Sequence, residues 1–264
     1  MIKTVALGTF DGMHIAHQEL VKKSDCIVVI GRGTATMTRG WRRSLYTNKE
    51  VVFYYLGDIR DLTAKEFISK LKKDFPNLNK IVVGYDFKFG KDRCGTIEIL
   101  KDVFDGEVEV VGEIKVDNIS VHARVIRDLI KSSNIKKANI LLGRNYSIEG
   151  KHIKGLGIGA KELVPTINLN VKNYTLPIGV FATIATINSK KYNSITFIGN
   201  RETIDNSFSV EVHILDKFNE NIKGKIWIEF IDFIRDNRKF NSISELKEQI
   251  FIDIKSAKKI LESR

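Results

Sequence analysis

The segment of residues 4–20, TVALGTFDGMHIAHQEL, restricts the possible folds of this 264-residue chain most strongly. It begins with an apolar, β-prone run, continues through a turn bracketed by Gly8 and Gly12, and leads into an apolar helical face at Leu20. This order predicts a strand, a tight turn and a helix. Because the first N–H groups of a helix lack internal acceptors and carry the positive end of its dipole, the junction favours binding of a phosphate.

Two histidines lie at this junction. His14 and His17 are three residues apart, so both side chains project from one side of the first helical turn. Imidazoles placed there can donate hydrogen bonds to phosphate oxygens while charge shifts during group transfer. The alternative is that one histidine caps the helix and the other is half-buried, but the glycines and the preceding strand favour a phosphate site.

The segment GTFDGMHIAHQEL resembles the GxFDGVHxGHxxL signature of bacterial bifunctional riboflavin kinase/FMN adenylyltransferases (FAD synthetases), which are HxGH nucleotidyltransferases. The resemblance implies that His14 and His17 are catalytic. It also implies that the turn binds ATP phosphates through Gly8, Phe10, Asp11 and Gly12. Ala16 replaces the usual glycine; because alanine is the better helix former by about 1 kcal/mol and adds one methyl group, we expect the site to be retained.

Composition limits the partners. The chain carries 43 basic and 32 acidic residues, a net charge of +11, which suits nucleic acid or the phosphates of ATP and flavins. No RNA-binding aromatic motif or zinc-finger spacing accompanies the charge, so we expect small-molecule substrates and no nucleic acid. Cys26 and Cys94 lack CxxC spacing, which fits a reducing cytoplasm. With no signal-peptide pattern and no apolar run near ~18 residues, we expect a cytoplasmic protein without membrane contact.

The first half of the chain alternates strands and helices. Apolar strands are predicted at residues 26–30 and 80–83, and Thr63 and Glu66 have capping-box spacing at the start of a helix. This alternation predicts a Rossmann-like, doubly wound parallel sheet, which binds ligands at the carboxyl ends of its strands. Arginines around Trp41 follow the strand at 26–30; we interpret them as a solvated mobile loop, with flavin or phosphate binding as the alternative.

Residues 84–90, GYDFKFG, with the following arginine and glycine, resemble the GxDFxFGxxRxG loop of the same family. The resemblance implies a flavin-binding role for Asp86, Phe87 and Arg93 in the adenylyltransferase site. For the two phenylalanines, Phe87 and Phe89, a role as core anchors of a β-turn is the favoured alternative.

A third family motif, Ser-Ser-Thr-x-Ile-Arg, is altered here. In residues 119–127, ISVHARVIR, the hydroxyl cluster is reduced to Ser120, and His122 lies nearby. Arg124 and Arg127 are three residues apart, so both can face the phosphates of ATP from one side of a helix.

Near Gly143 the pattern of apolar residues changes from alternating strands and helices to a run of short strands. The segment there resembles the LLGRPY join between the family's two modules. We therefore place the adenylyltransferase domain at residues 1–143 and the riboflavin kinase domain at 144–264. Short strands at 180–187, 191–198, 208–215 and 225–231, with a turn at Asn188 and Ser189, predict a small antiparallel barrel. A long amphipathic helix over residues 243–261 follows.

The candidate kinase site begins with alternating glycines, Gly155, Gly157 and Gly159. A Pro-Thr pair and a strand follow them, so they are not a Rossmann fingerprint, although they permit close approach of ATP phosphates to the backbone. The next residues resemble the GRxxGFPTANL motif of riboflavin kinases. Thr166 and Asn168 share one strand face and suit Mg²⁺ with ATP phosphates. Lys161 stands in for the family's arginine at a phosphate-binding position.

Residues 209–216, SVEVHILD, resemble the xxEvHLLDF strand of the family, which implies that Glu211 is the catalytic base. Riboflavin attacks ATP through an alcohol that must lose a proton, and a carboxylate can accept it. The alternative is that Glu211 is an ordinary carboxylate on the barrel surface with no catalytic role. Arg235 lies in a turn that resembles flRdEkkF and is expected to bind the flavin, against the alternative of a solvated charge.

Together these patterns predict a Mg²⁺-dependent enzyme that phosphorylates riboflavin with ATP and adenylylates the product, FMN, to FAD. One alternative is that only one module is active, since the departures at residues 160–164 and 122–124 affect one module each. A non-catalytic flavin- or nucleic-acid-binding protein is a further alternative, but charge explains none of the motif spacings.

Overall fold

The computed structural model describes residues 1–31, 33–154 and 163–263, which form two compact units, Met1–Val125 and Ile126–Arg264. The predicted boundary at Gly143 falls later, at the end of helix α6 (Ile135–Leu142), where Gly143 adopts a φ of 70°. Helix α6 belongs with the second unit because Asn139 donates a hydrogen bond of 2.9 Å to the carbonyl of Phe230 in strand β13. Gly143 therefore marks a helix end that lies inside the second unit.

The first unit contains a five-stranded parallel sheet in the order β3-β2-β1-β4-β5, as predicted for a doubly wound fold. Its elements are β1 (Thr4–Gly8), α1 (Ile15–Lys22), β2 (Cys26–Gly31), η1 (Gly40–Tyr46), β3 (Glu50–Tyr55), α2 (Leu56–Ile59), α3 (Ala64–Asp74), β4 (Lys80–Gly84), η2 (Lys91–Arg93), α4 (Ile97–Val103), β5 (Glu107–Val111), β6 (Lys115–Val116) and β7 (Ile119–Ser120). Helix α5 (Ala123–Lys131) follows.

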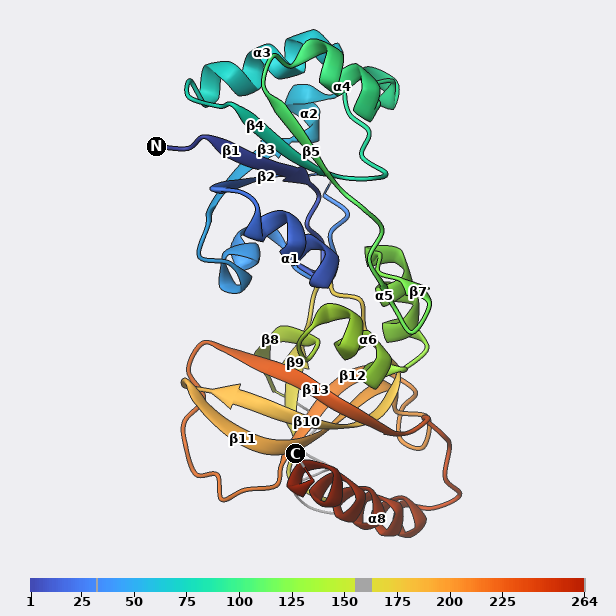
Figure 1. Cartoon of the computed structure of the whole chain (residues 1–264). Coiled ribbons are helices and arrows are strands. Elements are labelled where there is room, and N and C mark those ends of the chain that lie inside the picture. The colour runs from blue at the N-terminus through green and yellow to red at the C-terminus, as the bar shows by residue number, and fades with distance from the viewer. Residues whose placement is uncertain (32, 155–162, 264) are drawn as a thin grey trace. The chain divides into compact units, whose positions relative to one another are not determined.

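Helices cover both faces of this sheet (Figure 1). Alternate residues of β1 separate the two cores: Val5 and Leu7 pack with α3 and α4, whereas Ala6 packs with the buried face of α1. The predicted capping box starts α3, since Thr63 Oγ1 accepts from the backbone N–H of Glu66 and the Glu66 carboxylate accepts from the N–H of Thr63 at 2.8 Å. These hydrogen bonds also lower the pKa of Glu66.

The second unit is built on a closed antiparallel barrel with strand order β10-β11-β12-β9-β8-β13. Its strands are β8 (Ser147–Ile153), β9 (Ile167–Asn170), β10 (Gly179–Ile187), β11 (Lys190–Asn200), β12 (Phe208–Ile214) and β13 (Lys225–Arg235). The predicted hairpin turn is confirmed, because Asn188 and Ser189 both adopt left-handed φ values of 48° and 67°. The barrel encloses large aromatic side chains, including Phe181, Phe230 and Tyr146.

Helix α8 (Ile243–Glu262) is the predicted long closing helix, and Ser242 caps it by accepting from the N–H of Glu245. The helix packs against the barrel (Figure 1). Its predicted apolar face divides into two parts. Ile254, Ala257 and Leu261 pack on the barrel wall, whereas Leu246 and Ile250 line a cavity next to it. In the described part of the chain, no helix is both long and apolar enough to cross a membrane.

Candidate active sites

The first unit contains a cavity of about 480 Å³, called here the first-unit cavity. It forms where the turns after β1 and β4 meet, because these parallel strands are neighbours and their carboxyl ends lie at one edge of the sheet. The loop between β7 and α5 completes its wall. The polar and glycine residues of its lining are Gly8, Thr9, His14, His17, Gly84, Tyr85, Asp86, Lys88, Arg93, Gly112, Ser120, His122 and Arg124.

The two predicted histidines lie together in this cavity. Their rings stack with centroids 3.5 Å apart and an interplanar angle of 17°. His14 is the N-cap of α1, and its Nδ1 accepts from the backbone N–H of His17 at 3.3 Å. A neutral His14 ring must therefore carry its proton on Nε2, which makes that nitrogen a donor. Ala16 also lines the cavity, on the first turn of α1.

Phe10 and Asp11, predicted to bind phosphate, are not among the described residues that line the cavity. The Phe10 ring is fully buried against Gly8, where an added Cβ would approach it to 3.3 Å. The buried Asp11 carboxylate accepts backbone hydrogen bonds from residues 36–38 at 3.2, 3.0 and 2.9 Å. Gly12 adopts a φ of 88°, which favours glycine. These three residues support the turn, and their direct binding of phosphate stays a prediction.

Arg43 supports the same turn and was not identified from the sequence. Its guanidinium is buried and donates to the carbonyl of Thr9 through Nε at 3.1 Å and Nη2 at 2.9 Å. Burial lowers the pKa of Arg43, and the charge of Asp11 opposes that shift. Within the arginine-rich segment, Arg43 thus has a structural role, while Trp41 beside it is exposed. Only the three-dimensional approach of η1 to the turn reveals this.

The second family-like loop lies across the first-unit cavity from α1. Asp86, Phe87 and Arg93 all line the cavity, and the Phe87 ring also stacks on the buried Phe89 ring with centroids 5.7 Å apart. Phe87 thus packs against the core, as expected for a core anchor, and also lines the cavity, while its binding of flavin stays a prediction. Arg93 adopts a left-handed φ of 59°.

The two arginines of the altered third motif differ in their relation to the first-unit cavity. Arg124 lines the first-unit cavity, whereas Arg127 is not among its described lining residues. His122 replaces the missing hydroxyl cluster in the wall, and its Nε2 lies 2.7 Å from the hydroxyl of Tyr85. Sequence reasoning noted His122 but missed Tyr85, because their contact joins loops 37 residues apart.

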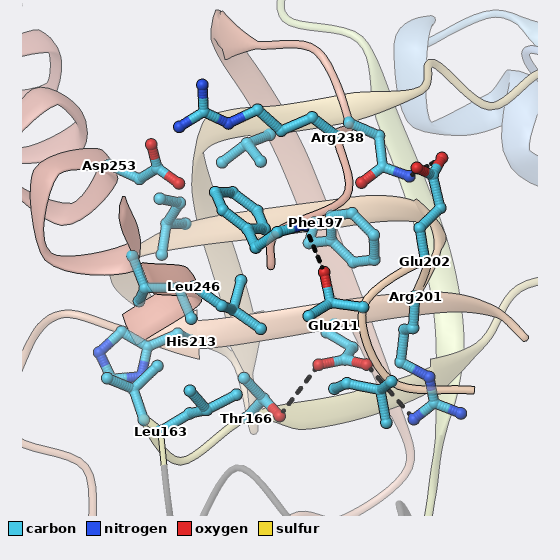
Figure 2. Close-up of a pocket in the computed structure, with 18 of the residues that line it drawn as sticks. Leu163, Thr166, Phe197, Arg201, Glu202, Glu211, His213, Arg238, Leu246 and Asp253 are labelled. Carbon is cyan, nitrogen blue, oxygen red and sulfur yellow. Dashed lines mark hydrogen bonds and ion pairs between the residues drawn. The ribbon is translucent and has the colours of Figure 1, made fainter. Parts of the chain in front are cut away.

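In the described part of the second unit, two cavities lie beside the predicted kinase residues. The Glu211 cavity, about 130 Å³, has an apolar wall that includes Val180, Phe197 and Leu246 (Figure 2). The Asn168 cavity, about 330 Å³, has a mixed wall in which Lys154, Asn168, Asn170 and Ser209 alternate with apolar side chains such as Leu169 and Val210. Arg201 lines both and is the one described residue that they share.

Glu211 lies on β12, where it is paired in register with Asn168 of β9 and Phe197 of β11. Its carboxylate lies between two groups (Figure 2): Thr166 Oγ1 donates to Oε2 at 3.4 Å, and Arg201 Nη1 lies 3.6 Å from Oε1. The side chain is 20% exposed, so it is open to the cavity. Nearby, Nδ1 of His213 lies 2.7 Å from the carbonyl of Pro165, the residue before Thr166.

Thr166 and Asn168, predicted to hold Mg²⁺, both lie next to Glu211, but Thr166 lines the Glu211 cavity whereas Asn168 lines the Asn168 cavity. Thr166, Asn168 and Glu211 share one side of the β9–β12 pair, since register partners and residues two apart on a strand have side chains on the same face. Their hydroxyl, amide and carboxylate oxygens are the hard donors that Mg²⁺ prefers beside phosphates. The donor set therefore fits the ion. The described residues contain no cluster of three or more His, Cys, Asp or Glu for a metal.

Arg235 lines the Glu211 cavity, but its guanidinium is bound to helix α8. Its Nε and Nη2 lie 2.9 and 2.8 Å from Asp253 Oδ2, and its Nη1 donates to the carbonyl of Asp236. The guanidinium also lies over the Phe240 ring, 5.5 Å from its centroid. Sequence reasoning did not identify Arg201, His213 or Asp253. The predicted Gly155, Gly157, Gly159 and Lys161 lie outside the described residues.

Comparisons with known proteins agree with this two-site arrangement. Residues 142–261 match the family model for riboflavin kinase, and residues 44–125 match the model for FAD synthetase. A bifunctional riboflavin kinase/FMN adenylyltransferase from Bacillus subtilis is 30% identical over 96% of this chain and 90% of its own length. One from Buchnera aphidicola is 32% identical over 95% of this chain and 90% of its own length.

A crystal structure described as a macrolide-efflux protein from Streptococcus pneumoniae superimposes with a TM-score of 0.83 and 28% identity, covering 97% of this chain and 93% of that one. The two cavities of the barrel, the histidine-lined cavity of the parallel sheet and these sequence matches lead to one conclusion. The chain belongs to the family of bifunctional riboflavin kinase/FMN adenylyltransferases.

Proposed function

We propose that the second unit phosphorylates riboflavin with ATP to give FMN, and that the first unit transfers AMP from a second ATP to FMN, giving FAD and pyrophosphate. The observation that carries this proposal is the chemical division between the units. One cavity gathers imidazoles and guanidinium groups, whereas the other holds a carboxylate between a hydroxyl and a cation. Family membership supports both activities.

In the kinase reaction, the primary alcohol oxygen of riboflavin attacks the γ-phosphorus of ATP. The new O–P bond forms as the bond to the β-bridging oxygen breaks, ADP leaves, and Glu211 accepts the alcohol proton. Thr166, through its hydrogen bond to Oε2, orients the carboxylate. Thr166 and Asn168 would hold Mg²⁺, which neutralises charge on the ATP phosphates when bound.

In the adenylyltransferase reaction, a phosphate oxygen of FMN attacks the α-phosphorus of ATP, and the bond to the bridging oxygen of pyrophosphate breaks. The nucleophile is already an anion, so no base is needed. The protein must align the two phosphates and stabilise negative charge. The Nε2–H of His14, the His17 ring, Arg93 and Arg124 supply donors and positive charge, and the N-terminus of α1 adds its dipole.

We assign the flavin of FMN to the wall formed by Asp86 and Phe87, and the flavin of riboflavin to the apolar wall beside Arg235. The ion pair of Arg235 with Asp253 keeps the cavity-lining half of α8 against this wall. We place the protein in the cytoplasm, where ATP is abundant and where free thiols such as those of Cys26 and Cys94 persist.

The test is incubation of the purified full chain with riboflavin, ATP and Mg²⁺, with flavins separated by chromatography and pyrophosphate measured in parallel. FMN should accumulate first and FAD second, and both should be absent when EDTA replaces Mg²⁺. Supplying FMN directly tests the first unit alone. Unchanged riboflavin refutes the kinase assignment, and unchanged FMN refutes the adenylyltransferase assignment.

A further inference from the structure

Arg201 has a position that the family-like motifs do not explain. Among the described residues it alone lines both the Glu211 cavity and the Asn168 cavity. It follows directly after β11, on the loop that returns to β12. Its side chain is 15% exposed, so most of it is packed while one face reaches the cavities.

The guanidinium of Arg201 is held in place from one side. Its Nε donates to Ser207 Oγ at 3.1 Å, and its Nη2 lies 2.9 Å from Asp205 Oδ2. The loop closes on itself, because the N–H of Arg201 donates to the carbonyl of Ser207 and the N–H of Asn206 donates to the carbonyl of Arg201. The group is thus pre-positioned, with Nη1 directed at Glu211 (Figure 2).

We propose that Arg201 is a catalytic residue that binds the γ-phosphoryl group of ATP during its transfer to riboflavin. This inference rests on the proposed kinase function. The transferred phosphorus must lie between the alcohol, whose proton goes to Glu211, and the departing ADP. Arg201 lines both the mainly apolar Glu211 cavity, which suits the flavin, and the mixed Asn168 cavity, where Lys154, Asn168 and Asn170 offer donors to a triphosphate.

The chemistry of arginine fits this position. With Nε and Nη2 engaged by Ser207 and Asp205, Nη1 can donate to a phosphate oxygen, and the guanidinium stays charged at any working pH. As the O–P bond to the alcohol forms and the bond to ADP breaks, negative charge spreads over the equatorial oxygens, where a fixed cation stabilises it. In the absence of phosphate, the same Nη1 faces the Glu211 carboxylate at 3.6 Å.

The test compares Arg201→Gln, Arg201→Lys and a matched control, Lys190→Gln, in the full chain. Lys190 begins β11, at the opposite end of the strand that precedes Arg201, and its ion pair with Glu220 is also lost on substitution. We expect Arg201→Gln to lower kcat for FMN formation about 10²–10³-fold and to raise KM for ATP, while KM for riboflavin changes less than about twofold. Arg201→Lys should recover part of the loss, and Lys190→Gln should match the parent protein.

The KM for riboflavin separates catalysis from loop structure. Glu202, Thr203 and Ile204 of the same loop line the Glu211 cavity, so a collapsed loop would raise KM for riboflavin as well. The proposal is overturned if Arg201→Gln raises KM for riboflavin as much as KM for ATP and Arg201→Lys recovers no activity. It is also overturned if Arg201→Gln has normal kinetics. If Arg201→Gln does not fold, KM for ATP and KM for riboflavin are compared for Arg201→Lys instead. A rise in KM for ATP alone supports the proposal, and an equal rise in both or no change overturns it. Absence of FMN formation in the parent protein would instead refute the kinase function itself.

Discussion

Replacement of Glu211 with Gln separates the two activities in one molecule. A general base contributes about 10²–10⁴-fold to a rate. At about 1.36 kcal/mol for each factor of ten, its loss corresponds to roughly 2.7–5.4 kcal/mol of transition-state stabilisation. Kinase turnover should fall by that factor, because glutamine cannot accept the alcohol proton at neutral pH. Conversion of added FMN to FAD should be unchanged.

The structure argues that this loss reports on chemistry and not on folding. Glutamine has the size of glutamate, and its remaining oxygen can still accept the hydrogen bond from Thr166. The backbone pairing of β12 with β9 and β11 does not involve the side chain. The contact with Arg201 is 3.6 Å long and partly solvated, so its loss should change the free energy of unfolding by less than about 1 kcal/mol.

Glu229→Gln is the matched control. Glu229 also lies on a barrel strand, is 24% exposed and pairs with a cation, Lys191 at 2.8 Å, but it lines neither barrel cavity. Flavin chromatography with riboflavin, and separately with FMN, gives both rates for each variant, and urea unfolding gives their stabilities. Normal FMN production by Glu211→Gln would refute the assignment of the base. Equal loss of both activities would show a structural role.

Three further predictions concern the first unit. His17→Asn should reduce FAD formation about 10²–10³-fold and leave FMN formation unchanged, because one donor of the adenylyltransferase site is lost; a normal FAD rate contradicts the assignment. Asp11→Ala should lower the free energy of unfolding of the first unit by about 3 kcal/mol in urea titrations, because three backbone N–H groups lose their acceptor; no change would place these groups in solvent. Ellman's reagent should label one thiol in the native chain, the exposed Cys94, and a second only after denaturation, because burial raises the pKa of Cys26 to about 12. Fast labelling of both thiols would contradict the burial of β2.

Much of the fold follows from local patterns. The turn after β1, the capping box of α3, the Asn188–Ser189 hairpin and the periodic face of α8 each depend on residues close in sequence, and each occurs as predicted. Two edge strands of the parallel sheet, β3 and β5, and one barrel strand, β8, were not predicted. Strands β5 and β8 mix charged and apolar residues, so their strand form depends on pairing with distant neighbours. Strand β3, EVVFYY, is β-prone along most of its length, so its local sequence already favours a strand.

The residues of the candidate sites also fall into those that the sequence indicates and those that only the folded structure reveals. In the sequence, helix or strand period shows that His14 and His17, and likewise Thr166 and Asn168, share a face. Glu211 became a candidate through the resemblance of its strand to the family motif. Tertiary structure alone decided which carboxylates and cations are already engaged. Asp11 binds the backbone of residues 36–38, and Arg235 binds Asp253. The contacts of Arg43 with Thr9 and of Arg201 with Glu211 are not evident from the local sequence, since each joins segments that folding brings together.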